Sequence, residues 1–489
     1  MHKNISLALF FLLLGGTLFF SMPKWLYSGD PIAIRTSSVS IIENGHFGVP
    51  FRDKKHIEKF LLEEHSYFIK NKEELRYYPK WGPAGPLIYT LPLLIEKAFT
   101  ENLSYLHAEE RFILILNIFN LGATLILSIY LFAFLGQVFA ARAPRFATLL
   151  ATLFATFLWH YTRSQSLEIF LCLFYCAYVY HFYAYARDPM KTRHLLFSSI
   201  NIIILFLLKN YFLLLVPLKM LSLLALHQKQ LGALKNNIRP LLWNFILPLG
   251  AGVILLLVSN NIRFGSWLAT GYETNAQIYA NFAGSPLTGW WGYIASPRYS
   301  IFTHFPVLLF GLMGLKLVYN KSPFLCFFLG IHFFAFGSLF SCLENWAGEW
   351  AYGPRLILFS LVPLSLFFCA LLNQIFGIEN KVKRWGIAIA IGMVMLASGF
   401  LQERVNRFPF FISYLVEQRI DFYTKHTNLL DYFQNTPVPI FAHELNAFKN
   451  GEKLFYPFIE MDGKESPESM KNLARDIKPL LKQNYYWLD

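Results

Sequence analysis

Residues Glu110 to Leu135 read ERFILILNIFNLGATLILSIYLFAFL, an apolar run whose only charges stand at its first two positions. A bilayer core about 30 Å thick is crossed by a helix of about 20 apolar residues, so this run predicts a membrane-spanning helix. Similar runs recur along the 489-residue chain, of which 55% is hydrophobic and 15% charged. Soluble proteins carry about 25% charged residues and do not repeat such runs. The sequence therefore predicts an all-α polytopic membrane protein.

The apolar runs predict about eleven membrane-spanning helices. In chain order they are Ile5–Leu26, Glu110–Leu135, Phe146–Tyr161, Leu167–Tyr185, Leu195–Leu208, Tyr211–Leu226, Leu241–Ser259, Ile301–Val318, Pro323–Leu343, Leu356–Leu372 and Trp385–Phe400. The first run is long and lacks a small-residue cleavage site, so we expect a retained anchor rather than a cleaved signal peptide. Residues 1–400 then form the transmembrane domain, and residues 401–489 form a small C-terminal extracytoplasmic segment.

Basic residues gather in every second short loop, and such loops mark the cytoplasmic side of a membrane. With Lys3 placing the N-terminus inside, the alternation puts the long loop 27–108 on the outer side with segment 401–489. We expect a multi-pass protein of the bacterial inner (plasma) membrane. The net charge of +13 does not indicate nucleic-acid binding, because the cations form no basic stripe.

The five cysteines lie within or at the ends of apolar runs: Cys172, Cys176, Cys326, Cys342 and Cys369. None lies in the large polar segments, so a disulfide framework is not expected. Cys172 and Cys176 share a helix face but have no His or further Cys near enough in sequence to complete a metal site. We interpret them as small buried hydrophobic residues.

Asp30 follows the first apolar run directly, in the sequence Tyr27-Ser28-Gly29-Asp30-Pro31. Asp before Pro is a good helix start, so a local N-cap is one interpretation. The other is a general base held at the membrane surface. The two roles do not exclude one another.

The segment Tyr78-Pro79-Lys80-Trp81-Gly82-Pro83-Ala84-Gly85-Pro86 is a rigid turn with one cation. Trp, Tyr and Lys favour the membrane interface, so the turn is either an interface anchor or a site where Lys80 holds a lipid-linked phosphate. Further along, Ser164-Gln165-Ser166-Leu167-Glu168 joins two apolar runs on the expected outer side. A carboxylate at the start of a helix, such as Glu168, is stabilised by the helix dipole.

The segment from Trp346 to Arg355 reads WAGEWAYGPR and is the densest aromatic and glycine cluster on the expected outer side. Its aromatic residues suit either an aromatic belt at the membrane interface or a platform for a sugar. Arg355 opens the next apolar run, where its guanidinium can bind phosphate oxygens in a bidentate manner.

These segments, in this order, resemble the GT-C superfamily of membrane glycosyltransferases, which includes the protein O-mannosyltransferases and the lipid A aminoarabinose transferases. The resemblance covers roughly residues 1–400, and the chain looks most like poorly characterised bacterial members. It rests on a first helix followed by Asp30, on the outer loop with its Lys80-Trp81-Gly82-Pro83 turn, and on a second acidic residue in a later loop. The resemblance implies that this large outer loop carries interfacial helices. Pro31 follows Asp30 where the protein O-mannosyltransferases have an Asp-Glu pair, which argues against a protein acceptor.

The resemblance implies transfer of a sugar from a polyprenyl-phosphate donor to a hydroxyl of a glycan, lipid or protein acceptor on the outer side. Asp30 would be the catalytic base, and Glu168 would position the acceptor or share that role. Five cations would bind the donor phosphate: Lys80, Lys209, Arg263, Arg298 and Arg355. Five side chains would bind the acceptor or sugar: Trp81, Trp346, Glu349, Trp350 and Tyr352.

No cofactor or metal is invoked, because His46, His160 and His304 have no ligand spacing. One alternative function is a polyprenyl-linked glycan ligase or polymerase, which would use a similar site to transfer a long glycan. Another is a lipid or glycan flippase. Transporters often show paired halves with interrupted helices, and the sequence shows none. The polar residues also gather on one side rather than at the membrane midplane.

Overall fold

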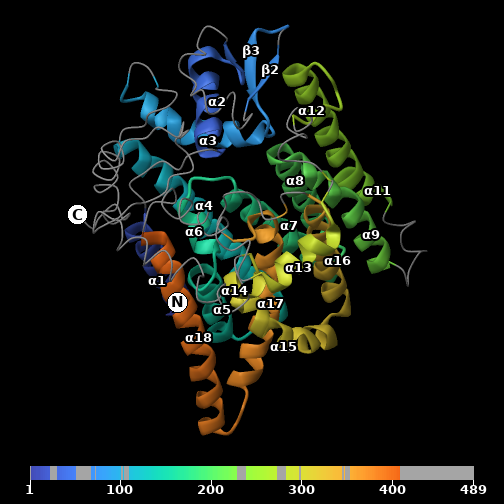
Figure 1. Cartoon of the computed structure of the whole chain (residues 1–489). Coiled ribbons are helices and arrows are strands. Elements are labelled where there is room, and N and C mark those ends of the chain that lie inside the picture. Colours follow the sequence, from blue (N-terminus) through green and yellow to red (C-terminus); the bar gives the residue numbers. More distant parts are fainter. Residues whose placement is uncertain are drawn as a thin grey trace.

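The computed structural model describes residues 2–22, 30–50, 68–71, 73–100, 103, 110–227, 238–271, 282, 284–296, 299–343, 346 and 353–407. Within these ranges a few helix residues, Asp30 among them, are described by their backbone alone. Figure 1 shows a bundle of helices with a small layer of helices and strands at one end. The layer contains α2 (Asp30–Asn44), α3 (Ala84–Lys97) and the strands, all from the long loop after the first helix.

The bundle is built from the apolar runs. In chain order its elements are α1 (His2–Phe20), α4 (Glu110–Val138), α5 (Arg142–Phe154), α6 (Leu158–Arg163), α7 (Glu168–Arg187), α8 (Thr192–Leu208), η3 (Asn210–Leu214), α9 (Leu215–His227), α11 (Ile238–Leu241), η4 (Leu242–Ile246), α12 (Leu247–Phe264), α13 (Pro286–Ala295), α14 (Ile301–His304), α15 (Pro306–Lys321), α16 (Pro323–Ser341), η6 (Arg355–Ile357), α17 (Leu358–Phe376) and α18 (Lys381–Arg407). The expected all-α polytopic architecture is confirmed.

Six helical stretches in the described ranges are long and apolar enough to cross a membrane. They are Ile113–Val138, Glu168–Arg187, Arg239–Phe264, Pro323–Ser341, Arg355–Phe376 and Lys381–Glu403. Shorter apolar helices cover Leu7–Phe20, Thr192–Leu208 and Asn210–Leu226. The expected spans overlap helices in the described ranges, but the total of about eleven crossings stays a prediction, because several helices are shorter than a bilayer requires.

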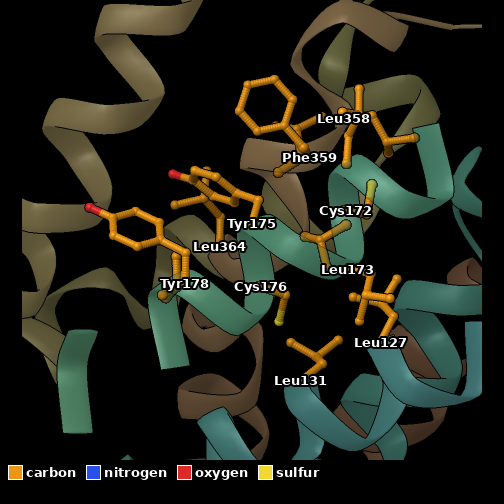
Figure 2. Close-up of a cluster of buried hydrophobic side chains, with 14 of the residues drawn as sticks. Leu127, Leu131, Cys172, Leu173, Tyr175, Cys176, Tyr178, Leu358, Phe359 and Leu364 are labelled. Carbon is orange, nitrogen blue, oxygen red and sulfur yellow. The ribbon is translucent and has the colours of Figure 1, made fainter. Parts of the chain in front are cut away.

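The centre of the bundle is formed by α7 and α17, of whose most apolar stretches 78% and 89% is buried. The corresponding share for α18 is 17%, so most of that helix faces outward. Figure 2 shows how Cys172, Tyr175 and Cys176 of α7 lie among leucine and phenylalanine side chains of α4 and α17. Both cysteines are buried free thiols, in the small-hydrophobe environment expected for them.

Close helix packing at the centre depends on small residues, as is common in membrane bundles. A Cβ on Gly314 of α15 would overlap the carbonyl oxygen of Phe367 in α17. A side chain at this position would therefore push the two helices apart.

Two expected spans are broken rather than continuous. The run Ile301–Val318 divides into α14 and α15 at Phe305, whose φ of −136° and ψ of 62° are not helical. Pro306 follows, and a proline disfavours the α conformation of the residue before it. The run Phe146–Tyr161 divides into α5 and α6, and the break lets the Phe157 N–H donate to the carbonyl oxygen of His304 at 3.0 Å.

The layer outside the bundle holds a three-stranded antiparallel sheet with the order β1-β3-β2 (Val49–Pro50, Arg76–Pro79, Phe68–Asn71). Beside it, α2 and α3 are joined by a buried bidentate ion pair. Arg35 Nη1 and Nη2 lie 2.7 and 2.6 Å from the two carboxylate oxygens of Glu96. Ser38 Oγ also donates to the Pro86 carbonyl at 2.8 Å. These contacts fix the helix that begins at Asp30 to the helix that follows the Lys80 turn.

The last described helix, α18, continues to Arg407, past the boundary expected at residue 400. Residues 408–489 lie outside the described ranges. The expected division into a transmembrane domain and a C-terminal extracytoplasmic segment therefore stays a prediction.

Candidate active site

Three of the expected site residues meet at the first turn of α7. Glu168 is the first residue of that helix and is 3% exposed. Lys209 Nζ, just after the end of α8, lies 3.3 Å from Glu168 Oε1. Arg355 Nη1, at the start of η6, lies 3.9 Å from the same oxygen. The fold thus brings together charges that are far apart in the sequence.

The other carboxylate oxygen of Glu168, Oε2, is buried and has no hydrogen-bond partner within the described ranges. Leaving a buried acceptor unpaired costs about 1–3 kcal/mol, and more when it is charged. Two cations and a helix N-terminus keep the carboxylate ionised, because each favours negative charge. The described residues therefore leave one oxygen of this carboxylate without a hydrogen-bond donor.

The Lys80 turn packs against the end of α8, next to Lys209. The Gly82 N–H donates to the Leu208 carbonyl oxygen at 3.1 Å. A Cβ on Gly82 would overlap the carbonyl oxygen of Leu207, so glycine is required for this close approach. The turn therefore places Lys80 and Lys209 on adjoining backbone segments, and Lys80 is 9% exposed with its Nζ 5.4 Å from the centre of the Trp81 ring.

Arg263, at the end of α12, supports the same turn. Its Nη1 donates to the Trp81 carbonyl oxygen at 2.5 Å, and its Nη2 donates to Asn260 Oδ1 at 2.8 Å. The side chain is 2% exposed. Gly271 closes the turn from the other side: its φ is +83°, and a Cβ there would lie 2.9 Å from the Lys80 carbonyl oxygen. Arg263 is thus placed to hold the turn that carries Lys80.

Asp30 is the first residue of α2, which agrees with the expected helix start. Its side chain lies outside the described part of the structure, so its distance from Glu168 is not defined. Through the Arg35–Glu96 pair, α2 is anchored to α3, and α3 begins directly after the Lys80 turn. The backbone at Asp30 is therefore connected to the turn through the contacts between α2 and α3.

Solved structures of other proteins share this arrangement of helices. No family model and no curated protein matches the chain by sequence. The crystal structure of ArnT from Cupriavidus metallidurans bound to undecaprenyl phosphate matches with a TM-score of 0.55 and 11% identity, over 91% of this chain and 80% of that one. The oligosaccharyltransferase AglB from Archaeoglobus fulgidus, in complex with an inhibitory peptide and a dolichol-phosphate, matches with a TM-score of 0.52 and 12% identity, over 90% of this chain.

This chain shares the fold of these two polytopic membrane proteins. The expected resemblance is thereby confirmed at the level of the fold. The match covers 60% of the AglB chain, so a large part of that protein has no counterpart here. At 11% and 12% identity the likeness concerns the fold alone, and the roles of individual residues stay predictions.

The remaining expected site residues contribute less to the described site. Trp81 is 2% exposed and belongs to the hydrophobic core, so its role in sugar binding stays a prediction. Trp346 packs its ring against Tyr293 and Tyr299, with ring centroids 5.3 and 5.6 Å away. The other predicted residues lie outside the described ranges: Arg298, Glu349, Trp350 and Tyr352.

The three histidines considered in the sequence each contact other protein groups. His46 Nδ1 accepts from the Gly48 N–H at 3.1 Å, His160 Nδ1 lies 3.2 Å from Asn406 Oδ1, and the His304 carbonyl binds Phe157. Among the residues that the structure describes, no three His, Cys, Asp or Glu side chains gather as a metal site would require.

The sequence analysis did not single out two residues with unusual environments, Lys219 and Gln165. Lys219 is fully buried in α9, where its Nζ donates to Ser198 and Ser199 Oγ at 2.7 and 2.8 Å. A lone lysine within an apolar run was a visible signal for a buried cation. By contrast, nothing in the sequence indicates that Gln165 has a positive φ of 45°.

Proposed function

We propose that this chain transfers a sugar from a polyprenyl-phosphate donor to an acceptor hydroxyl on the extracytoplasmic side of its membrane. The observation that carries the proposal is the Glu168–Lys209–Arg355 cluster, with one carboxylate oxygen unpaired. An available carboxylate and an excess of cations suit a reaction that handles a hydroxyl and a phosphate together. The GT-C-like fold supports the same class of chemistry.

The proposed reaction is a displacement at the anomeric carbon of the sugar. The acceptor oxygen forms a bond to that carbon while the bond from the carbon to the phosphate oxygen breaks. The acceptor proton passes to a carboxylate, for which Asp30 is our first choice, and the polyprenyl phosphate leaves as an anion. Glu168 Oε2 would orient the acceptor or share the role of the base.

Charge develops on the leaving phosphate, so cations fixed in place lower the barrier without having to reorganise. Lys80, Lys209 and Arg355 are the described candidates for direct contact, and Arg298 is a further one. Arg263 would act through the turn, because its guanidinium already binds the Trp81 carbonyl oxygen. We also propose a periplasmic or other extracytoplasmic location for the site, in an inner-type membrane.

A polyprenyl-linked glycan ligase or polymerase remains the second candidate. One of the two structures compared above is an oligosaccharyltransferase, so the fold is compatible with transfer of a longer glycan. A donor that carries a single sugar and a donor that carries a long glycan distinguish the two candidates in a turnover assay.

Binding of undecaprenyl phosphate tests the donor site without requiring the sugar to be known. We expect the wild-type protein in lipid nanodiscs to bind it and Lys80→Met to bind it at least about tenfold more weakly, because a charged hydrogen bond contributes about 1.5–3 kcal/mol. Lys321→Met is the matched control, since Lys321 ends α15 and packs its Nζ on Phe139 instead. Equal affinity of wild type and Lys80→Met for undecaprenyl phosphate would show that Lys80 does not bind the phosphate.

A further inference from the structure

The loop between α6 and α7, which delivers Glu168, is strained. Gln165 has a φ of +45°, in the left-handed region that costs a residue with a side chain about 1–2 kcal/mol. Gln165 is 1% exposed, and its neighbours Ser164 and Ser166 are buried as well. A conformation of this kind persists only where the surroundings hold it, and such positions cluster at functional sites.

Two side chains from other helices hold Gln165 in this conformation. Tyr89 of α3 donates its hydroxyl to the Gln165 carbonyl oxygen at 2.5 Å. Gln165 Nε2 donates to Asn117 Oδ1 of α4. Tyr89 is 3% exposed, and burial, together with the nearby negative charge of Glu168, raises its pKa above the ordinary value. The phenol therefore remains a hydrogen-bond donor at physiological pH.

Tyr89 also connects this loop to the Lys80 turn. Helix α3 begins at Ala84, directly after the turn, and Tyr89 lies on its second turn. At the start of α3, a Cβ on Gly85 would lie 3.2 Å from the Leu167 side chain, so the helix and the loop are in close contact. One short helix thus follows directly on the turn that carries Lys80, the cation that we assign to the donor phosphate, and contacts the loop that ends at Glu168.

We propose that Tyr89 is a positioning residue, which fixes Glu168 Oε2 relative to the Lys80 turn through its hydrogen bond to Gln165. This inference rests on the function proposed above. Without the phenol hydroxyl, Gln165 can relax towards negative φ, and the following residues move with it. A misplacement of about 1 Å at a reacting group can lower a rate about a hundredfold. Tyr89→Phe should therefore lower kcat and leave the KM for the donor unchanged.

The test compares Tyr89→Phe with Tyr178→Phe. Tyr178 is also buried in the bundle, and its hydroxyl lies 3.0 Å from His332 Nε2, away from the Glu168 loop. Hydrogen exchange of the peptide that spans residues 163–168 reports on the loop without any turnover. We expect exchange there to become at least tenfold faster in Tyr89→Phe and to match wild type in Tyr178→Phe. Where a sugar donor is turned over, kcat should fall at least tenfold in Tyr89→Phe alone.

Three negative results have different meanings. If wild type turns over a polyprenyl-phosphate sugar and Tyr89→Phe matches it in kcat and in exchange, the positioning role is wrong and the proposed function stands. If Tyr89→Phe loosens the loop but wild type neither binds nor turns over any such donor, the proposed function fails, while the structural link from Tyr89 to the loop holds. Equal loss of kcat in both variants would indicate a general packing defect and overturn the inference.

Discussion

Lys209 Nζ lies 3.3 Å from Glu168 Oε1, and the two side chains are only 7% and 3% exposed. A buried ion pair is a poor source of stability, because desolvation of both charges offsets their attraction. Glu168 adds to that cost by keeping Oε2 unpaired in the described structure. The pair therefore fits the role that we propose for Glu168 better than a role in stabilising the fold.

Substitutions at this pair should separate stability from activity. Lys209→Met leaves the buried carboxylate with Arg355, 3.9 Å away, as its remaining cation among the described residues, and should lower stability by up to about 3–5 kcal/mol. Adding Glu168→Gln to Lys209→Met should restore most of the thermal stability and leave turnover abolished. Thermal unfolding in detergent and donor turnover are the two measurements. A double variant that recovers activity would contradict a functional role for Glu168.

Gly82→Ala should displace the Lys80 turn from α8, because the new Cβ would overlap the Leu207 carbonyl oxygen. Overpacking of this kind costs about 1–3 kcal/mol. We expect undecaprenyl phosphate to bind at least about tenfold more weakly. Gly386→Ala in α18 is the matched control, since no atom lies within 4 Å of its added Cβ. Equal binding by all three proteins would show that the position of the turn does not matter.

The outer loop should lose local structure in mild acid through His46. Burial, with a further contribution from Arg76, lowers the pKa of His46. A depressed pKa contributes stability that is fully present above the unfolded value of about 6.5 and is lost as pH falls through the folded value. Protonation also removes the Nδ1 acceptor for the Gly48 N–H. Exchange protection around Gly48 should therefore fall as the pH is lowered below about 6.5 in wild type but not in His46→Gln. Identical pH profiles for the two proteins would refute this prediction.

Sidedness can be tested with an impermeant thiol reagent. Glu73→Cys lies in the exposed turn between β2 and β3, and Met190→Cys, between α7 and α8, is the opposite control because Met190 is 86% exposed. The alternating basic loops predict labelling in intact cells for Glu73→Cys and for an added cysteine within residues 408–489. Met190→Cys should react only after lysis. The reverse pattern would overturn the topology.

Much of the fold could be predicted from the sequence, because the bilayer demands long apolar helices. The helix breaks at Phe305 and between α5 and α6 are harder to predict from the sequence, since tertiary hydrogen bonds such as the one from Phe157 to His304 stabilise them. Composition also gives no exact count of crossings when helices such as α5, with 13 residues, are short.

The candidate site could be predicted in part. Glu168, Lys80 and Arg355 stand out as charges beside apolar runs, and the order of the segments suggested the family. Sequence does not show that Arg263 donates to the Trp81 carbonyl or that Tyr89 reaches Gln165. Both contacts join residues that are distant in the chain, and no local pattern encodes them.

Turnover by the purified protein in lipid, against a panel of polyprenyl-phosphate sugars, tests the central claim most directly. Free polyprenyl phosphate is measured for wild type, Asp30→Asn and Glu168→Gln. We expect wild type to release it, and Asp30→Asn, which caps a helix as well as Asp, to bind donor and react at least about a hundredfold more slowly. If Asp30→Asn keeps its rate while Glu168→Gln loses it, the base is Glu168. If the wild type neither binds any donor of the panel nor releases polyprenyl phosphate from any of them, the proposed glycosyltransferase activity is contradicted.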